Sequence, residues 1–237
     1  MQGVLVVTVV FAALAVLVAY SRWLAGRRWA AAGNLLVALL LFTFARVFWP
    51  AAANLASYQP MPREGPVAQV FCERTGPGIY RLTLTRLHEG RMQLFEMAGD
   101  EWRLDIRTLA WRDSATRLGL APSFRLDRLS GRFLSTASPV AAPAAAPVLP
   151  SGYPLSEYDE PGEDLWAQAR TGSLWERHAD AGHIYSSWRP LAHGGRYDVW
   201  LSHEGGNGAR LEARPANEPA AKAVQARERA QQAVAAR

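Results

Sequence analysis

Two long apolar runs near the start of the chain constrain its fold more than any other feature. The first, residues 4–20, has no side chain more polar than threonine, and the second, residues 30–49, contains only Asn34, Thr43 and Arg46 as polar residues. A helix needs about 20 residues, with a lower limit of about 17, to cross a hydrocarbon core about 30 Å thick. Both runs are long enough, so the sequence predicts a transmembrane helical hairpin.

The segment between the two runs predicts the orientation of this hairpin. It contains Arg22, Arg27 and Arg28 and no acidic residue. Short loops rich in arginine and lysine remain in the cytoplasm. We therefore expect an inner-membrane protein of a bacterium with two spans, a cytoplasmic turn, and both termini in the periplasm.

Aromatic residues mark the expected boundaries of the two spans. Tyr20, Trp23, Trp29 and Trp49 lie near the ends of the runs, and amphipathic rings prefer the level of the lipid headgroups. Arg46 lies one helical turn before Pro50, from where its long side chain can reach the headgroups. The sequence thus predicts lipid as a partner along the whole hairpin.

The net charge belongs mostly to the hairpin. The chain has a formal charge of +5, of which the four arginines of residues 1–60, with no acid among them, account for all but +1. The basic composition therefore does not indicate a nucleic-acid partner. The single cysteine, Cys72, excludes an intrachain disulfide and a cysteine-based zinc site, and we expect no cofactor.

Residues 57–136 have the alternation of a β-meander. In 79–87, for example, apolar residues at every second position form one face of a half-buried strand. The alternation changes phase at Thr108, which predicts a β-bulge there, because one extra residue reverses the facing of all that follow. Further strands are expected at residues 67–73, 92–97, 101–112 and 124–133.

The rest of the chain divides by composition into three parts. Residues 137–154 are an Ala/Pro-rich linker, and residues 155–215 predict a short helix at 163–171 followed by strands that complete the same β domain. Residues 216–237 form a basic, alanine-rich tail, either helical or disordered. The fold class is α+β: a transmembrane hairpin, then a mainly antiparallel β domain with one short helix and the tail.

Four histidines are weak candidates for metal ligands. They are His178, His183, His193 and His203, and histidine is the commonest metal ligand. Their spacing matches no zinc motif, so the sequence predicts no metal site. It also contains no phosphate-binding loop and no nucleophile elbow, and no catalytic residue is predicted.

Arginines alternate along the expected strands and admit two interpretations. They could contact anionic headgroups, or they could pair across strands with the interleaved Asp105 and Asp127. We favour ion pairs. The arginines concerned are Arg81, Arg103, Arg107, Arg125, Arg128 and Arg132.

Four stretches resemble a known family. They are ANLASYQ at 53–59, GDEWRLD at 99–105, RLDRLSGR at 125–132 and DLWA at 164–167. The chain is similar on these stretches to two-span inner-membrane proteins of gammaproteobacteria, some of which bear the label of multidrug transporter or cation efflux pump. The resemblance implies the same architecture and no particular site residues.

These observations lead to one functional hypothesis and two alternatives. The favoured hypothesis is a non-enzymatic accessory or scaffold protein whose periplasmic β domain binds another envelope protein or a second copy of itself. The alternatives are a subunit of an efflux or transport complex and a membrane-anchored periplasmic enzyme. The two spans contain none of the inverted repeats and broken helices that are typical of secondary transporters.

Overall fold

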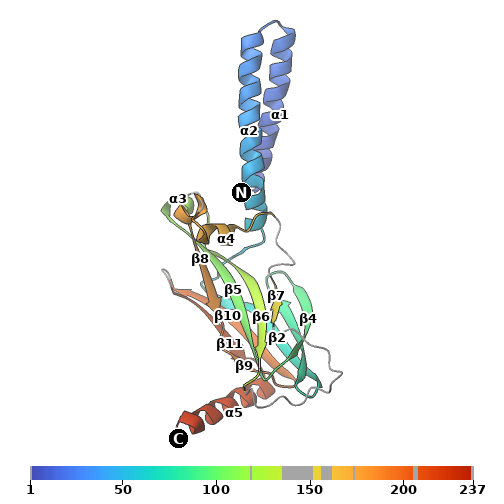
Figure 1. Cartoon of the computed structure of the whole chain (residues 1–237), viewed down its shortest axis with the longest axis vertical. Coiled ribbons are helices and arrows are strands. Elements are labelled where there is room, and N and C mark those ends of the chain that lie inside the picture. Colours follow the sequence, from blue (N-terminus) through green and yellow to red (C-terminus); the bar gives the residue numbers. More distant parts are fainter. Residues whose placement is uncertain are drawn as a thin grey trace. The chain divides into compact units, whose positions relative to one another are not determined.

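The computed structural model describes residues 2–117, 119–134, 152–155, 162–172, 174–204 and 208–235. The chain forms two compact units. The helical unit comprises residues 1–58 and 159–177, and the β unit comprises residues 59–158 and 178–237. Figure 1 shows the elements of both.

The helical unit is built on a hairpin of α1 (Gln2–Leu24) and α2 (Arg28–Leu55), which run side by side in opposite directions (Figure 1). Both helices are long and apolar enough to cross a membrane. In the most apolar segment of each helix, only 11% of the residues of α1 and 22% of those of α2 are buried. A core helix of a soluble domain would be mostly buried. The two apolar helices predicted from the sequence are therefore confirmed.

Alanines form the contact between the two helices. Buried alanines recur at every seventh position of α2, and α1 contributes two more with the same spacing. A seven-residue repeat keeps one stripe of a helix facing its neighbour, and small side chains let membrane helices approach closely. The seam consists of Ala31, Ala38, Ala45 and Ala52 of α2 and Ala12 and Ala19 of α1.

A short helix packs against the end of α2. Helix α4 (Leu165–Arg170) begins at the N-cap residue Asp164, whose carboxylate accepts hydrogen bonds from the backbone N–H groups of Trp166 and Ala167 at 3.0 and 3.1 Å. The backbone N–H of Leu165 donates to Oδ1 of Asn54 in α2, at 3.2 Å. A 3-10 helix, η1 (Leu174–Arg177), follows.

The β unit contains two antiparallel sheets. Strand β10 of the second β segment lies between β11 and β2 in sheet B, and β8 of the same segment pairs with β5 in sheet A. Both segments of the chain therefore contribute to each sheet. The predicted α+β class is confirmed. Sheet A has the order β1 (Gln59–Pro60), β6 (Ser123–Arg132), β5 (Glu101–Trp111), β8 (Ala179–Tyr185), with β7 (Gly152–Pro154) on β6 and β9 (Arg189–Pro190) on β5. Sheet B has the order β11 (Gly208–Pro215), β10 (Gly195–Glu204), β2 (Glu64–Gly76), β3 (Ile79–Arg86), β4 (Arg91–Ala98).

One hydrophobic core joins the two sheets. Trp102, Leu104 and Ile106, alternate residues in the first half of β5, belong to it, as the alternating pattern predicts. Trp102 of sheet A meets Tyr197 of sheet B edge to face, with ring centroids 5.4 Å apart, and both side chains are fully buried. Such an aromatic pair adds about 0.5–1.5 kcal/mol to the stabilisation from buried area.

The predicted bulge at Thr108 is wrong in its position. Strand β5 pairs with β8 without interruption from Asp105 to Trp111. The extra residue is Asp127 of β6, because Asp105 pairs with Arg128 and Ile106 with Leu126. Leu109 is fully buried but does not belong to the core between the sheets. Its side chain can therefore lie on the other face of β5 from Ile106 without a bulge in this strand.

The C-terminal helix α5 (Glu218–Ala235) packs on the β unit. Ala220 is fully buried in the core, and Val224 packs against it. Asn217 caps the helix by accepting from the backbone N–H of Ala220 at 3.2 Å, and its Nδ2 donates to the carbonyl of Gly194 at 2.7 Å. Of the two states expected for this tail, helical or disordered, the structure has the helix, and small side chains suffice for its contact with the core.

Candidate functional site

The outer face of sheet A contains a network of charged residues. Arg103, Asp105 and Arg107 alternate with the core residues of β5. The bulge in β6 adds Asp127, and β8 adds His183. Nε of Arg107 lies 2.6 Å from Oδ1 of Asp127, and Nε of Arg103 lies 2.9 Å from Oδ1 of Asp105. The Arg107–Asp127 pair crosses from β5 to β6, as the sequence pattern favours, whereas Arg103 and Asp105 lie on the same strand.

His183 belongs to this network through both ring nitrogens. Nε2 lies 2.9 Å from Oδ2 of Asp127, and Nδ1 lies 3.2 Å from the hydroxyl of Tyr185. A general base needs a ring nitrogen within hydrogen-bond reach of the group that it deprotonates. Because both nitrogens already have protein partners, the arrangement supports an orienting role for this imidazole.

Burial perturbs one carboxylate of the network. The side chain of Asp105 is only 3% exposed, and this burial raises its pKa above the usual value of 3.8. The positive charge of Arg103 and the nearby His183 oppose the rise in pKa, while Asp127 adds to it. The charges of this network on the outer face of sheet A therefore partly neutralise one another.

The four histidines are not brought together. His178 is exposed just before β8, and His183 pairs with Asp127. His193 lies in the turn before β10, where its Nδ1 accepts from the backbone N–H of Arg74 at 3.1 Å. His203 lies near the far end of the same strand, roughly 30 Å from His193 at the usual rise per residue. Among the described residues, no three His, Cys, Asp or Glu side chains are grouped so that they could hold a metal ion.

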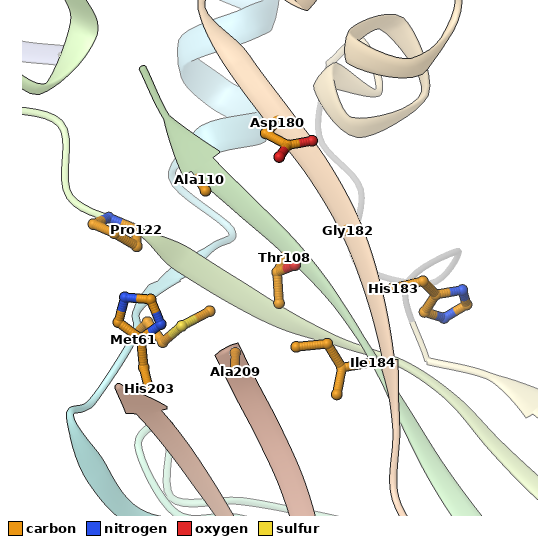
Figure 2. A pocket seen from close by; sticks show the side chains of 10 residues that line it. All are labelled: Met61, Thr108, Ala110, Pro122, Asp180, Gly182, His183, Ile184, His203 and Ala209. Carbon is orange, nitrogen blue, oxygen red and sulfur yellow. The ribbon is translucent and has the colours of Figure 1, made fainter. Parts of the chain in front are cut away.

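A cavity of about 250 Å³ opens in the β unit beside the paired ends of β10 and β11. Figure 2 shows Thr108 and Ile184 of sheet A and His203 and Ala209 of sheet B around it, while the side chain of His183 points away. Nδ1 of His203 is buried and has no hydrogen-bond partner in the part of the chain that the structure describes. The remaining lining residues are Met61, Ala110, Pro122, Asp180 and Gly182.

Sheet B ends in β4, whose outer edge pairs with no further strand in the part of the chain that the structure describes. The edge strand β11, on the other side of the sheet, contacts β8. In β4, the hydroxyl of Tyr153 donates to the carbonyl of Glu96, so this carbonyl points away from β3. Because antiparallel pairs alternate, the backbone groups of Leu94 and Met92 also point away from β3. Among the described residues these groups have no further partner, and the side chains of Met92 and Leu94 are 65% and 64% exposed.

The residues expected at the lipid interface lie at the ends of the hairpin helices. Arg22 is in the last turn of α1, Arg27 is the N-cap of α2, and Arg28 is its first residue. Trp29 follows directly and is 93% exposed. Tyr20 and Trp23 lie near the end of α1, and Trp49 lies in the second half of α2; all three are exposed.

Comparison of the chain with protein-family models, with curated proteins and with solved structures finds no match.

Proposed function

We propose that the protein is a membrane-anchored, non-enzymatic module of the bacterial inner membrane whose β unit lies in the periplasm and binds another envelope protein. The observation that supports binding best is the open edge of β4 beside the exposed side chains of Met92 and Leu94. A sheet edge with free N–H and C=O groups is a template for a further strand.

The proposed mode of binding is strand addition. An extended segment of the partner would hydrogen-bond to the outward backbone groups of Met92 and Leu94, and its side chains would cover the two exposed apolar ones. Tyr153 closes the other end of this edge at Glu96. The site thus offers room for a short apolar segment rather than for a long strand.

The charge distribution supports the proposed orientation. All three cations near the turn lie within seven residues of one another with no acid among them, which favours a cytoplasmic turn. The β unit follows α2 in the chain and would then be periplasmic. The resemblance to two-span inner-membrane proteins of gammaproteobacteria fits the same arrangement.

Two cysteine variants test the orientation. We expect Thr75→Cys, in the exposed end of β2, to react with a membrane-impermeant maleimide in spheroplasts. Ala25→Cys, in the exposed turn of the hairpin, should react only after the membrane is permeabilised. The reverse pattern would overturn the proposed topology.

A photo-crosslinking amino acid at position 94 tests the binding edge in cells. We expect a crosslink to a different protein from position 94 and none from position 222, where Lys222 is 74% exposed on α5. A crosslink only to a second copy of the chain would contradict a different envelope protein as the partner and would indicate self-association instead. If positions 94 and 222 capture the same proteins, or if neither captures any, the proposal is wrong.

A further inference from the structure

A second hollow lies beside α5, among residues that the proposed partner site does not use. It has a volume of about 400 Å³, within the range of small-molecule sites, about 300–1,000 Å³. Four elements contribute to it, namely α5, β5, β6 and β9. Its lining residues are Glu101, Arg132, Ser187, Trp188, Arg189, Pro190, Val224, Arg227, Glu228 and Gln231.

Two arginines of this groove share one buried carboxylate. Arg132 contacts Oε2 of Glu101 through Nε at 2.8 Å and Nη2 at 2.7 Å, and Arg227 contacts Oε1 through Nε at 2.6 Å. The side chain of Glu101 is 2% exposed. One negative charge thus neutralises only one of the two guanidinium groups.

Arg189 adds a third positive charge to the wall. Its Nε donates to the backbone carbonyl of Ala213 at 2.6 Å, and it has no carboxylate partner among the described residues. Glu228 lies on the exposed side of α5. Counting Arg132, Arg189 and Arg227 against Glu101 and Glu228, the lining has a formal charge of +1.

Trp188 holds part of this wall in place. The guanidinium carbon of Arg132 lies 4.2 Å from the centre of the indole ring, and that of Arg103 lies 4.8 Å from it. Arginine stacked on an aromatic ring and paired with a carboxylate has little freedom left to lose when a ligand binds. The groove is therefore preorganised.

We propose that this groove binds the phosphate group of a small phosphorylated molecule or lipid headgroup. Guanidinium groups match phosphate oxygens with two parallel hydrogen bonds. Arg227 uses only Nε for Glu101, and Arg132 uses Nε and Nη2, so each retains N–H donors beyond its ion pair. With three guanidinium groups around it, the groove complements the several oxygens of a phosphate better than the two of a carboxylate.

Calorimetry of the full chain in nanodiscs of neutral lipid tests this site with phenyl phosphate and inorganic phosphate as probes. We expect Arg189→Gln to weaken the binding of phenyl phosphate by roughly 10-fold or more, as the loss of a charged hydrogen bond implies. Glu228→Gln should strengthen it, and Lys222→Gln, on the same helix outside the groove, should leave it unchanged. Arg189 is chosen because it makes no ion pair with Glu101, so its substitution leaves this buried carboxylate paired with Arg132 and Arg227.

The source of the phosphate is distinguished by a second arm with nanodiscs that contain phosphatidic acid. Competition by this lipid against phenyl phosphate would assign the headgroup, and its absence would assign a soluble ligand. Lack of binding by every probe, or equal weakening by Arg189→Gln and Lys222→Gln, would overturn the site. Neither result bears on crosslinking at position 94, so this proposal and the proposed function are tested separately.

Discussion

Nε of Arg227 lies 2.6 Å from Oε1 of Glu101, a residue 126 positions earlier in the chain. The contact joins the C-terminal helix to the first residue of β5, and the carboxylate is 2% exposed. A buried charge that loses its partner costs far more than a surface pair contributes. This ion pair therefore makes α5 part of the β unit rather than an appendage.

Substitution of Glu101 should be more harmful than substitution of either arginine. We expect Glu101→Ala to lower the free energy of unfolding by about 1.5–3 kcal/mol, because Arg132 and Arg227 both lose their charged hydrogen bonds. Arg227→Ala should cost less, since Arg132 still neutralises Glu101. Urea denaturation of the full chain in detergent, followed by circular dichroism, measures both.

The exposed pair of Lys222 and Glu218 on the same helix provides a control for this comparison. Lys222→Ala should leave the urea midpoint unchanged, because exposed pairs contribute little. Equal losses of stability in Glu101→Ala and Arg227→Ala would contradict the shared carboxylate.

Cys72 should be chemically silent in the folded protein. Its side chain is fully buried, and burial raises the pKa of the thiol to about 12, against a smaller opposing effect of a hydrogen bond with the backbone of Ala192. Because only the thiolate reacts, about one molecule in 10⁴ would be reactive at pH 8.

Mass spectrometry after treatment with a maleimide should show no modification of Cys72 in the folded chain and complete modification in urea. Rapid labelling without denaturant would show that the β2 strand opens. Because Cys72 does not react in the folded protein, labelling of the Ala25→Cys and Thr75→Cys variants can be measured without replacing Cys72.

Asp105 should give the β unit a measurable pH dependence. Its folded-state pKa is raised by burial, so between 3.8 and the raised value the folded state binds more protons than the unfolded state. Stability from this group therefore falls as the pH rises through that window. We expect the stability of Asp105→Asn relative to the wild type to increase from pH 4 to pH 7, as measured by urea midpoints. A difference that does not change with pH would contradict the raised pKa.

Gly182 should not tolerate a side chain. A Cβ at this position would lie 2.6 Å from Oγ1 of Thr108 on the neighbouring strand. Overpacking of this kind costs about 1–3 kcal/mol, so Gly182→Ala should lower the thermal midpoint. Thr108→Ala removes the clashing atom, and the double variant should be more stable than Gly182→Ala alone. If the two losses simply add, the clash is not their cause.

The local periodicity of the sequence was sufficient to predict much of the fold. The apolar runs predict α1 and α2, and the alternation in β3 and in the first half of β5 predicts which residues face the core. The short helix predicted at residues 163–171 is α4, which is shorter, at Leu165–Arg170. These features depend on neighbours in the chain.

Features that depend on distant neighbours were missed. The bulge lies in β6 because of its pairing with β5, and a phase change within β5 alone does not reveal it. The docking of α5 depends on Asn217, Ala220 and Arg227, whose partners lie far away in sequence. The alanines seven residues apart in α1 and α2 are visible in the sequence, yet no seam was predicted from them.

The alanine seam makes the packing of α1 against α2 sensitive to the number of residues inserted into either helix. Each residue turns an α-helix by about 100°, so one residue inserted between Ala38 and Ala45 would rotate Ala31 and Ala38 away from the face that contains Ala45 and Ala52. Insertion of seven residues would preserve the facing and lengthen the span instead. Insertions that lengthen the two helices therefore preserve the seam only in multiples of about seven residues.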